Sequence, residues 1–439
     1  MSKQMTVAIA GLGSRGRDTY AKAAKIYPDK MKIVAIADID PEKVKLTAEE
    51  YDVPMSHCYE SAEDMLKEEK LADVMIIATQ DRQHVGQAIK ALKKGYHLLL
   101  EKPISPDLGE CRKISEVAKE CKREVVVCHV LRYTPIYQKV KEILDAGTIG
   151  DVISIMAIEN VGWFHQAHSF VRGNWANSDE TSPMILQKCC HDMDLYLWLA
   201  DKKCKSLSSF GSTYLFKEEN APEGCTKRCL DGCKVKATCP YDAESIYLDS
   251  ERIGARNGNT RWPLDVVTEI PTPESVEEAL KTGPYGRCVY HCDNDVVDHQ
   301  VVNLNMTDGS TMSFSMNGHT ADFARHAQFC GTKGEMNVTM GSWDVEDDFI
   351  ETTLFGAKLK TELIPASELS DDFSGHGGGD IVMVEEFVDI LLGNREESPS
   401  ITSLEKSVES HYCALAAEES RLHGGAVIEL DDIRQKGSM

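Results

Sequence analysis

The stretch QKCCHDMD, residues 187–194, carries side chains that could do chemistry in two different ways. Cys189 and Cys190 stand beside His191, and thiolates and imidazoles are the ligands that zinc prefers. The same residues are also compatible with one turn of a catalytic helix, on which His191 would act as a general base. The spacing of these residues along the chain distinguishes between a metal site and a catalytic helix.

Helical spacing favours the catalytic interpretation. A helix over residues 186–199 would carry four polar side chains on one face, namely Gln187, His191, Asp194 and, more obliquely, Lys188. Cys190 falls on the apolar face of the same helix, and Cys189 points nearly opposite His191. We therefore predict that neither cysteine shares a metal with His191, and that His191 is the functional residue.

A glycine motif near the N-terminus predicts a dinucleotide site. The motif lies between a short apolar strand and a helical stretch, and consists of Gly11, Gly13, Ser14, Arg15 and Gly16. Its glycines allow a tight turn and a close approach of the backbone to a pyrophosphate, while the helix N-terminus offers free N–H groups to the anion. These five residues are the first candidates for cofactor binding.

The second predicted strand indicates which dinucleotide is bound. The apolar stretch KIVAIADID ends in Asp38, which lies 22 residues after Gly16. An acidic residue at about this distance accepts hydrogen bonds from the adenosine ribose hydroxyls, and its charge disfavours a 2′-phosphate. The sequence therefore favours NAD over NADP.

Strands and helices alternate through the rest of the N-terminal part. A strand over 73–79, a helix that begins near His84 and a strand that ends in Glu101 and Lys102 predict a doubly wound parallel sheet. Ligands of such sheets bind at the carboxyl ends of the strands. We therefore expect Thr79, His84, Glu101 and Lys102 to line the cofactor crevice, with the amine of Lys102 directed into it.

Five segments resemble, in the same order, the family of glucose–fructose oxidoreductase, inositol dehydrogenase and their relatives. They are AGLGSRG, VAIADID, LLLEKP, CHVLRYTPIYQKVKEILDAGTIGDV and QKCCHDMD. The resemblance implies an α/β fold with two domains. Residues 1–130 would form an NAD-binding Rossmann domain, and residues 131–439 an α+β domain for substrate binding and oligomerisation, with a large, mostly antiparallel open sheet. A cysteine-rich insert is expected at about 204–292.

The resemblance also implies a catalytic pair. In the family, the lysine of the E-K-P motif and a histidine of the second domain handle the proton of a sugar or cyclitol hydroxyl during hydride transfer. Lys102 and His191 match these positions. Inositol dehydrogenase carries an aspartate four residues before the histidine, where this chain has Gln187 followed by Lys188. Lys188 would lower the pKa of His191 or Lys102, or grip the substrate, and Tyr133 is a further catalytic candidate.

Side chains that suit a sugar are spread over several segments. Aromatic rings stack on the C–H faces of a sugar, whose hydroxyls need fixed hydrogen-bond partners. The candidates for substrate binding are Arg132, Trp163, His165, Gln187, Tyr290, Asn294 and His376. For Tyr290 and Asn294, solvated loop residues are an equally good interpretation.

Four cysteines of the expected insert could hold a metal. Cys225, Cys229, Cys233 and Cys239 could close a tetrahedral structural zinc site, which would leave no open position for catalysis. An iron–sulfur cluster is a less favoured metal centre. Four reduced thiols in a surface loop are the metal-free alternative.

The charge of the chain restricts its partners. With 48 Lys and Arg against 71 Asp and Glu, the net charge of −23 would repel phosphate backbones and anionic membranes, so nucleic-acid and membrane partners are not expected. Neither a signal peptide nor a membrane-spanning apolar run is visible, which predicts a cytoplasmic protein with reduced cysteines. An open sheet face predicts a homodimer or homotetramer.

Three functions remain open. The first is an NAD-dependent dehydrogenase that takes hydride from a secondary hydroxyl of a sugar, a sugar derivative or a cyclitol. The second is a glycoside hydrolase that uses bound NAD to oxidise the sugar transiently at C3 and then eliminates the aglycone. The third is a sugar sensor without catalysis. Lys102 and His191 argue against the sensor, which needs no proton acceptor.

Overall fold

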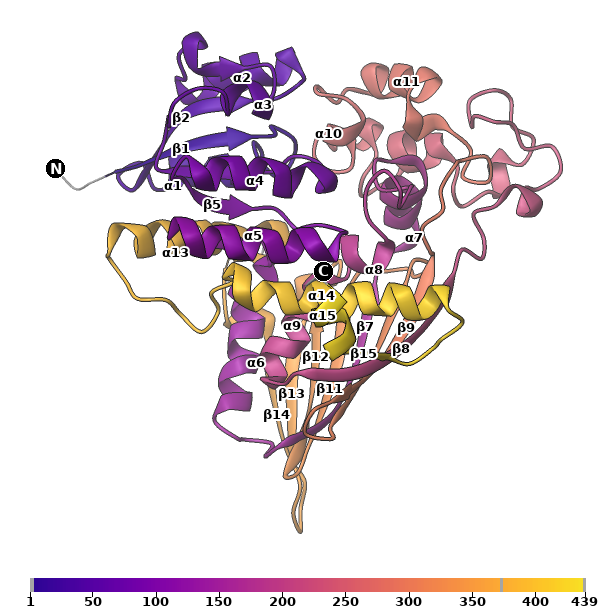
Figure 1. Cartoon of the computed structure of the whole chain (residues 1–439). Helices are drawn as coiled ribbons and strands as arrows, with labels where there is room; N and C mark the ends of the chain where they lie inside the picture. The colour runs from indigo at the N-terminus through magenta and orange to yellow at the C-terminus, as the bar shows by residue number, and fades with distance from the viewer. Residues whose placement is uncertain (1–3, 372–373, 437–439) are drawn as a thin grey trace.

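The computed structural model describes residues 4–371 and 374–436, and its strands form two separate sheets (Figure 1). The first sheet is parallel, with six strands in the order β3-β2-β1-β4-β5-β6 of a dinucleotide-binding fold. Its strands are β1 (Met5–Ala10), β2 (Met31–Ala37), β3 (Cys58–Tyr59), β4 (Val74–Ile77), β5 (His97–Leu100) and β6 (Val125–Val127).

Alternating side chains of this sheet pack into two cores. In β1, Val7 and Ile9 belong to one core, whereas Ala8 and Ala10 belong to the other. The first core is closed by α1 (Ala23–Ile26), α2 (Pro41–Tyr51) and α13 (Gly379–Leu392), and the second by α3 (Ala62–Met65), α4 (His84–Lys93) and α5 (Leu108–Cys121). Burial on both faces explains why these strands read as continuous apolar runs.

The second sheet has nine strands in the order β14-β13-β12-β11-β7-β10-β9-β8-β15. Only the pairing of β7 with β10 is parallel among the described strands of this sheet. The strands are β7 (Val152–Asn160), β8 (Cys204–Ser212), β9 (His299–Met306), β10 (Thr311–Asn317), β11 (Arg325–Gly331), β12 (Gly334–Met340), β13 (Phe349–Leu354), β14 (Lys360–Pro365) and β15 (Ile428–Glu429). The predicted fold class, a Rossmann sheet followed by a large, mostly antiparallel sheet, is confirmed.

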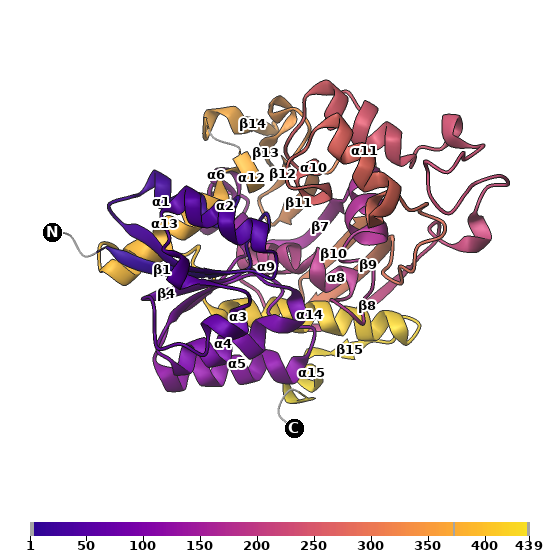
Figure 2. The same cartoon turned by 90° about the horizontal axis from the view of Figure 1, so that it is seen from above.

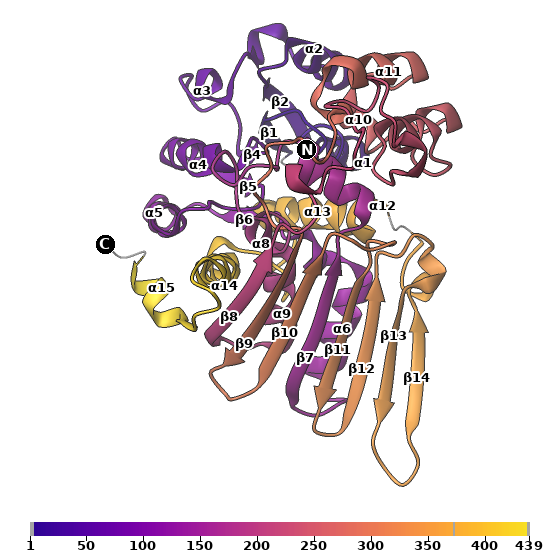
Figure 3. The same cartoon turned by 90° about the vertical axis from the view of Figure 1, so that its right-hand side faces the viewer.

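Helices cover one face of the second sheet and leave the other face open (Figure 3). The covering helices are α6 (Pro135–Asp145), α9 (Cys190–Ala200) and α14 (Leu404–Leu422). Along β7 and β9 the side chains alternate between buried and exposed, and the exposed set includes Met156, Ile158 and Val301. The sheet therefore presents apolar side chains to solvent on its open face.

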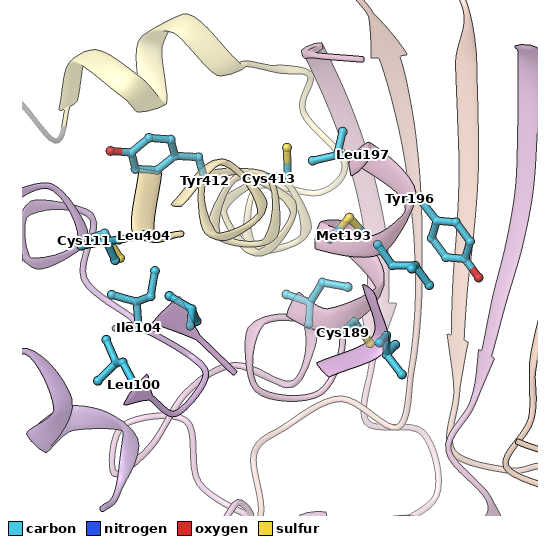
Figure 4. Close-up of a cluster of buried hydrophobic side chains, with 14 of the residues drawn as sticks. Leu100, Ile104, Cys111, Cys189, Met193, Tyr196, Leu197, Leu404, Tyr412 and Cys413 are labelled. Carbon is cyan, nitrogen blue, oxygen red and sulfur yellow. The ribbon is translucent and has the colours of Figure 1, made fainter. Parts of the chain in front are cut away.

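The C-terminal part of the chain returns to the first sheet. Helix α13 packs in the core with β1 and β2, and α14 packs between α5 and α9 (Figure 4). Tyr412 and Cys413 of α14 lie in the same apolar cluster as Cys189. The short helices α12 (Ser374–Gly377) and α15 (Leu430–Lys436) complete this part.

A lobe of short helices stands beside the Rossmann sheet (Figures 1 and 2). It contains α7 (Trp163–His165) with the π-helical turn Gln166–Arg172, α10 (Leu264–Val267) and α11 (Pro273–Thr282). The predicted start of the insert at residue 204 is wrong, because Cys204–Ser212 forms strand β8. Glu269 of the lobe reaches the Rossmann domain through ion pairs with Lys43 at 3.1 Å and Arg17 at 3.8 Å.

The predicted continuous helix over residues 186–199 is also wrong. Helix α8 (Met184–Gln187) ends before Lys188, and α9 begins at Cys190. Because of this break, the carbonyl oxygen of Gln187 does not accept a hydrogen bond from an N–H group of the following helix. It accepts one from the amine of Lys102 instead.

None of the described helices is both long and apolar enough to cross a membrane.

Candidate active site

The glycine loop after β1 has the shape that a dinucleotide requires. Gly11 has a φ of +90°, and a Cβ there would lie 2.4 Å from the carbonyl oxygen of Ala78. A Cβ on Gly16 would lie 1.9 Å from the carbonyl oxygen of Gly11. A Cβ on Gly13 would meet no atom within 4 Å, so the loop is open where a pyrophosphate would approach.

The segment after this loop differs from the predicted helix. Residues 14–19 form turns, followed by a 3₁₀ turn (Tyr20–Lys22) and the single α-helical turn of α1. The hydrogen bonds of Tyr20 N to Arg15 O and of Ala21 N to Gly16 O span five residues, so the turn is wider than an α-helix. The expected helix N-terminus is therefore irregular at this site.

Asp38 lies at the end of β2, where the ribose of a dinucleotide would bind. Its Oδ2 accepts a hydrogen bond of 2.6 Å from Leu12 N, and its Oδ1 accepts one of 2.9 Å from Asp40 N. The carboxylate is thereby fixed against the glycine loop, which is the geometry that the sequence predicts.

Two further loops at the carboxyl ends of strands are joined by His84. Its Nδ1 lies 2.7 Å from the carbonyl oxygen of Pro103, and its Nε2 lies 3.0 Å from that of Thr79. The hydroxyl of Thr79 donates to Gln87 at 2.7 Å. Because the polar atoms of the His84 ring are engaged, this residue positions the loops after β4 and β5 and is not directed at a cofactor as predicted.

Arg15 and Glu101 belong to a buried charge network. The guanidinium of Arg15 lies 2.7 Å from Glu101 and 2.6 Å from Asp380, and Tyr20 donates a 2.5 Å hydrogen bond to Glu101. The positive charges of Arg15 and Lys102 hold the pKa of Glu101 below its usual range against the effect of burial. The side chain of Arg15 is therefore committed to carboxylates, contrary to the prediction that it contacts the cofactor.

Lys102 follows β5 and reaches across to the second domain. Its Nζ donates a 2.7 Å hydrogen bond to the carbonyl oxygen of Gln187. Its backbone N–H donates to Glu101 at 2.8 Å. The amine is thus held between the Rossmann sheet and the helices that carry His191.

His191 is surrounded by basic side chains, including Lys102, His129 and His376. Its ring centroid is 5.6 Å from that of His129 and 5.7 Å from that of His376. Burial, followed by the charge of Lys102, lowers the pKa of His191 well below its ordinary value. His191 is therefore a neutral imidazole at physiological pH, and a neutral imidazole can accept a proton.

Lys188 is bound by a carboxylate. Its Nζ lies 3.2 Å from Glu159, whose other oxygen lies 3.0 Å from Arg325, and Arg325 also pairs with Asp192 at 2.8 Å. Burial lowers the pKa of His165, and the charge of Lys188 lowers it further. Burial also lowers the pKa of His376, on which the charge of Lys188 acts after those of Asp380 and Arg15. The neighbours that act on the pKa of His191 are instead Lys102, His129, His376 and Arg325.

Arg132 and Tyr133 have structural roles, in contrast to their predicted roles in substrate binding and catalysis. Arg132 forms a buried bidentate pair with Asp194 of α9, with both N–O distances at 2.6 Å. Tyr133 is 1% exposed and its hydroxyl contacts Thr402 in the Rossmann core. The carboxylate of Asp194, three residues after His191 on α9, is therefore paired with Arg132.

The substrate candidates separate into two groups. His376 lies beside His191, with the ring centroids 5.7 Å apart, and the charges of Lys188 and Lys102 add to burial in lowering the pKa of His165. Trp163 packs in the lobe against Phe164 and Tyr241.

Tyr290 and Asn294 lie elsewhere in the lobe, contrary to the prediction. Tyr290 lines a small cavity with several cysteines, and Asn294 donates to the carbonyl oxygen of Phe216 at 3.3 Å. Both side chains are therefore engaged within the lobe, Tyr290 in an apolar cluster that contains Phe216 and Asn294 against the backbone of the same residue.

His129 was missed by the sequence analysis. It follows β6, is 1% exposed, and neither of its ring nitrogens has a hydrogen-bond partner among the described residues. Burial, and then the charges of Arg132 and Lys102, lower its pKa well below the ordinary value. Its position at the carboxyl end of a Rossmann strand was a usable signal.

The four cysteines predicted as zinc ligands all line the cavity that contains Tyr290. The ligand atoms that converge, however, belong to Cys225, Cys288 and His291. Of the four predicted cysteines, only Cys225 belongs to this converging group.

Two family models match the chain, one in its N-terminal part and one in the part that follows. A family model described as an oxidoreductase family with an NAD-binding Rossmann fold matches residues 5–129. A second model, described as the GFO/IDH/MocA C-terminal domain, matches residues 137–229. The chain belongs to the GFO/IDH/MocA oxidoreductase family.

Two curated relatives are named as oxidoreductases. A putative oxidoreductase YteT of Bacillus subtilis is 24% identical over 403 residues, which cover 88% of each chain. Inositol 2-dehydrogenase of Salmonella typhimurium is 24% identical over 203 residues, which cover 46% of this chain and about half (56%) of the enzyme.

Solved structures show the same fold over nearly the whole chain. An oxidoreductase from Agrobacterium radiobacter, crystallised with NAD⁺, L-tartaric acid and magnesium, aligns with a TM-score of 0.67. It is 15% identical and covers 98% of this chain and 100% of its own. At this identity the likeness establishes the GFO/IDH/MocA fold alone.

The Rossmann residues of this GFO/IDH/MocA protein fit a dinucleotide. Gly11 and Gly16 have no room for a side chain, the space beside Gly13 is open, and Asp38 is held at the end of β2. This arrangement provides a place for the pyrophosphate and a carboxylate for the ribose.

Proposed function

We propose that the protein is an NAD-dependent oxidoreductase that takes hydride from a secondary hydroxyl of a sugar, a sugar derivative or a cyclitol. The observation that carries the proposal is the neutral, buried His191 close to Lys102, at the carboxyl edge of a Rossmann sheet. NAD, when bound, supplies the hydride acceptor.

His191 and Lys102 would have different roles when the substrate hydroxyl loses its proton. Oxidation of a carbinol requires a base within hydrogen-bond reach of its O–H group. Burial and the charge of Lys102 keep His191 uncharged, and its Nδ1 has no hydrogen-bond partner among the described residues, so a ring nitrogen is available to accept the proton. The ammonium of Lys102 donates a hydrogen bond to the same oxygen and stabilises the negative charge that develops there.

His376 and His165 would contact the sugar next to this pair. His376 is held by a 3.2 Å contact of its Nδ1 with Asp380, and it faces His191. His165 lies 4.9 Å from Trp262 between ring centroids, at the base of the lobe. Neutral imidazoles both donate and accept hydrogen bonds, which suits the hydroxyl groups of a sugar.

The proposal is tested by incubating the purified protein with NAD and two substrate panels. One panel holds free sugars, sugar acids and cyclitols, and the other holds nitrophenyl glycosides. We expect NADH to accumulate in proportion to the substrate consumed from the first panel. The His191→Asn variant, which still binds NAD, should lose this activity.

Two results would contradict the proposal. Nitrophenol release without net NADH, abolished when the cofactor is stripped, would indicate a redox glycosidase. Binding of a sugar without product in either panel would indicate a sensor.

A further inference from the structure

The lobe beside the Rossmann sheet is rich in cysteine residues. Six of the fifteen cysteines in the chain lie between residues 225 and 292, and none of the six takes part in the proposed oxidation. Five of them line one small cavity, namely Cys225, Cys229, Cys233, Cys239 and Cys288. The cavity has a volume of about 10 Å³, roughly the space of one water-sized sphere.

Two segments distant in sequence bring these side chains together. Cys229 N donates to Gly286 O at 3.0 Å, and Cys288 N donates to Lys227 O at 2.9 Å. These bonds form an antiparallel bridge between Arg228 and Arg287. The bridge places the first cysteine run opposite the segment that carries Cys288 and His291.

Ligand atoms from both segments converge. Cys225 Sγ lies 3.4 Å from His291 Nε2, and these two atoms and Cys288 Sγ all lie within 4.8 Å of one another. Two sulfur atoms on a tetrahedral zinc ion lie about 3.8 Å apart, since each Zn–S bond is about 2.3 Å long. Side-chain movements of at most about an ångström would therefore bring the three atoms onto one ion.

A buried arginine beside the cavity is a second observation, independent of the converging ligand atoms, that points to a negative charge in the cavity. Arg172 is 1% exposed, and no carboxylate of the described residues lies within ion-pair distance of it. Its guanidinium donates to the carbonyl oxygens of Arg287 and Tyr241, its Nη2 lies 3.6 Å from Cys229 Sγ, and its Nη1 has no partner.

Burial of a guanidinium without a counter-charge is costly, so an anionic group in the cavity would stabilise Arg172 beyond its hydrogen bonds to carbonyl oxygens. Neutral thiols do not provide one. A zinc ion with three thiolates and one imidazole carries one net negative charge, which would balance the charge of Arg172.

We propose that Cys225, Cys288 and His291, with one thiolate from Cys229, Cys233 or Cys239, hold a structural Zn²⁺ ion. The four ligands leave no open position on the metal, so the site is structural. It fastens the lobe to Arg172, which ends the helical segment that begins with Trp163 and carries His165. The site is independent of the proposed oxidoreductase activity.

The test measures metal in the full-length protein, purified without chelator from cells grown with zinc. We expect about one zinc per chain and little iron by elemental analysis. The Cys225→Ser and Cys288→Ser variants should each lose at least about nine-tenths of the zinc. The matched control is Cys58→Ser, which removes a part-buried cysteine of the Rossmann domain and should retain the metal.

A second measurement keeps the test valid if these variants do not fold. In the wild-type protein, removal of metal with a chelator should increase the number of thiols that react with an alkylating reagent and lower the melting temperature. Retained NAD binding would show that the Rossmann domain is still folded. Replacement by Co²⁺ should give the visible spectrum of a tetrahedral thiolate site.

Several outcomes would overturn the proposal. They are zinc below about a tenth of an ion per chain in the wild-type protein, iron with sulfide in place of zinc, and zinc that persists in the Cys225→Ser/Cys288→Ser double variant. A thiol count that the chelator does not change would also overturn it.

Discussion

The Nζ of Lys102 lies 2.7 Å from the carbonyl oxygen of Gln187, and this hydrogen bond joins the loop after β5 to the end of α8. The carbonyl is free to accept because α8 ends at Gln187 and α9 begins only at Cys190. His191 is the second residue of α9, so the broken helix fixes the imidazole relative to the amine. The geometry of the proposed catalytic pair thus depends on a contact between the two domains.

Replacement of Lys102 by methionine should abolish most of the activity and preserve cofactor binding. The loss of a positioned proton-handling group costs about 10²–10⁴-fold in kcat. NAD affinity should change little, because the glycine loop and Asp38 are untouched. Steady-state kinetics and calorimetric titration with NAD measure the two effects. Lys93→Met on the exposed face of α4 is the control, and equal activity of both variants would refute the role of Lys102.

The buried pair of Arg132 and Asp194 should contribute to stability, with no role in catalysis. Arg132→Met leaves the Asp194 carboxylate buried without its partner, so the free energy of unfolding should fall by about 3–5 kcal/mol. The double variant Arg132→Met/Asp194→Leu removes both charges and should recover most of this loss. Urea unfolding of the three proteins measures it. A single variant as stable as the wild type would contradict the assignment.

The elements of the Rossmann sheet could be predicted because their signals are local. Strands buried on both faces read as apolar runs, and the positive φ of Gly11 is a local property of the turn after β1 that favours glycine. The break at Lys188 could not be predicted in this way. It coincides with contacts to Glu159 and Lys102, which are distant in sequence, and the local pattern of residues 186–199 favours a continuous helix.

The candidate functional residues were predictable only where a strand end or a motif located them. Lys102 and His191 met this condition, and so did Asp38. The polar side chains of Arg132 and Tyr133 suggested a site, but their partners Asp194 and Thr402 lie 62 and 269 residues further along the chain. Whether a polar side chain faces a ligand or a buried partner is a property of the tertiary structure.

Stability should fall in acid because buried histidines stay neutral in the folded protein. His411 accepts a hydrogen bond from Ile104 N and its Nδ1 contacts Ser407 O at 3.0 Å, and burial lowers its pKa to about 3. The unfolded chain binds a proton near pH 6.5 and the folded one does not, so this stability is present above pH 6.5 and is lost toward pH 3. Between pH 7 and pH 5, His411 alone should lower the free energy of unfolding by about 2 kcal/mol.

The measurement for His411 compares urea unfolding at the two pH values. The His411→Gln variant should lose about 2 kcal/mol less than the wild type between pH 7 and pH 5, whatever its stability at pH 7. The exposed His423→Gln variant is the control and should keep the wild-type dependence. Identical dependence in the wild type and His411→Gln would show that His411 is not the responsible group.

The charge of Asp38 should set the preference for NAD. Asp38→Asn retains one side-chain oxygen as an acceptor for Leu12 N but removes the negative charge that would repel a 2′-phosphate. The ratio of the Kd values for NADP and NAD should therefore fall by about tenfold or more, a change of about 1.4 kcal/mol. Calorimetric titration of both cofactors measures it. Glu42→Gln on the exposed part of α2 is the control, and an unchanged ratio in Asp38→Asn would contradict this basis for selectivity.

The open face of the second sheet should be the interface of a homo-oligomer. Ile158, Val301 and Phe210 lie in register across β7, β10, β9 and β8, with Ser315 between the first two, and the three apolar side chains are 41%, 41% and 55% exposed. Exposed apolar side chains gathered on one sheet face in this way mark a surface that another protein surface covers.

Val301→Glu places a charge in the centre of this row, so we expect it to convert a dimer or tetramer into a monomer. Light scattering after size-exclusion chromatography measures the mass of the particle. Met55→Glu removes an equally apolar, exposed side chain of the Rossmann domain and should leave the oligomer intact. A monomeric wild-type protein, or an intact oligomer in Val301→Glu, would show that the subunits do not meet at this face. A monomer in Val301→Glu with full NAD binding would show that the Rossmann domain folds independently of the interface.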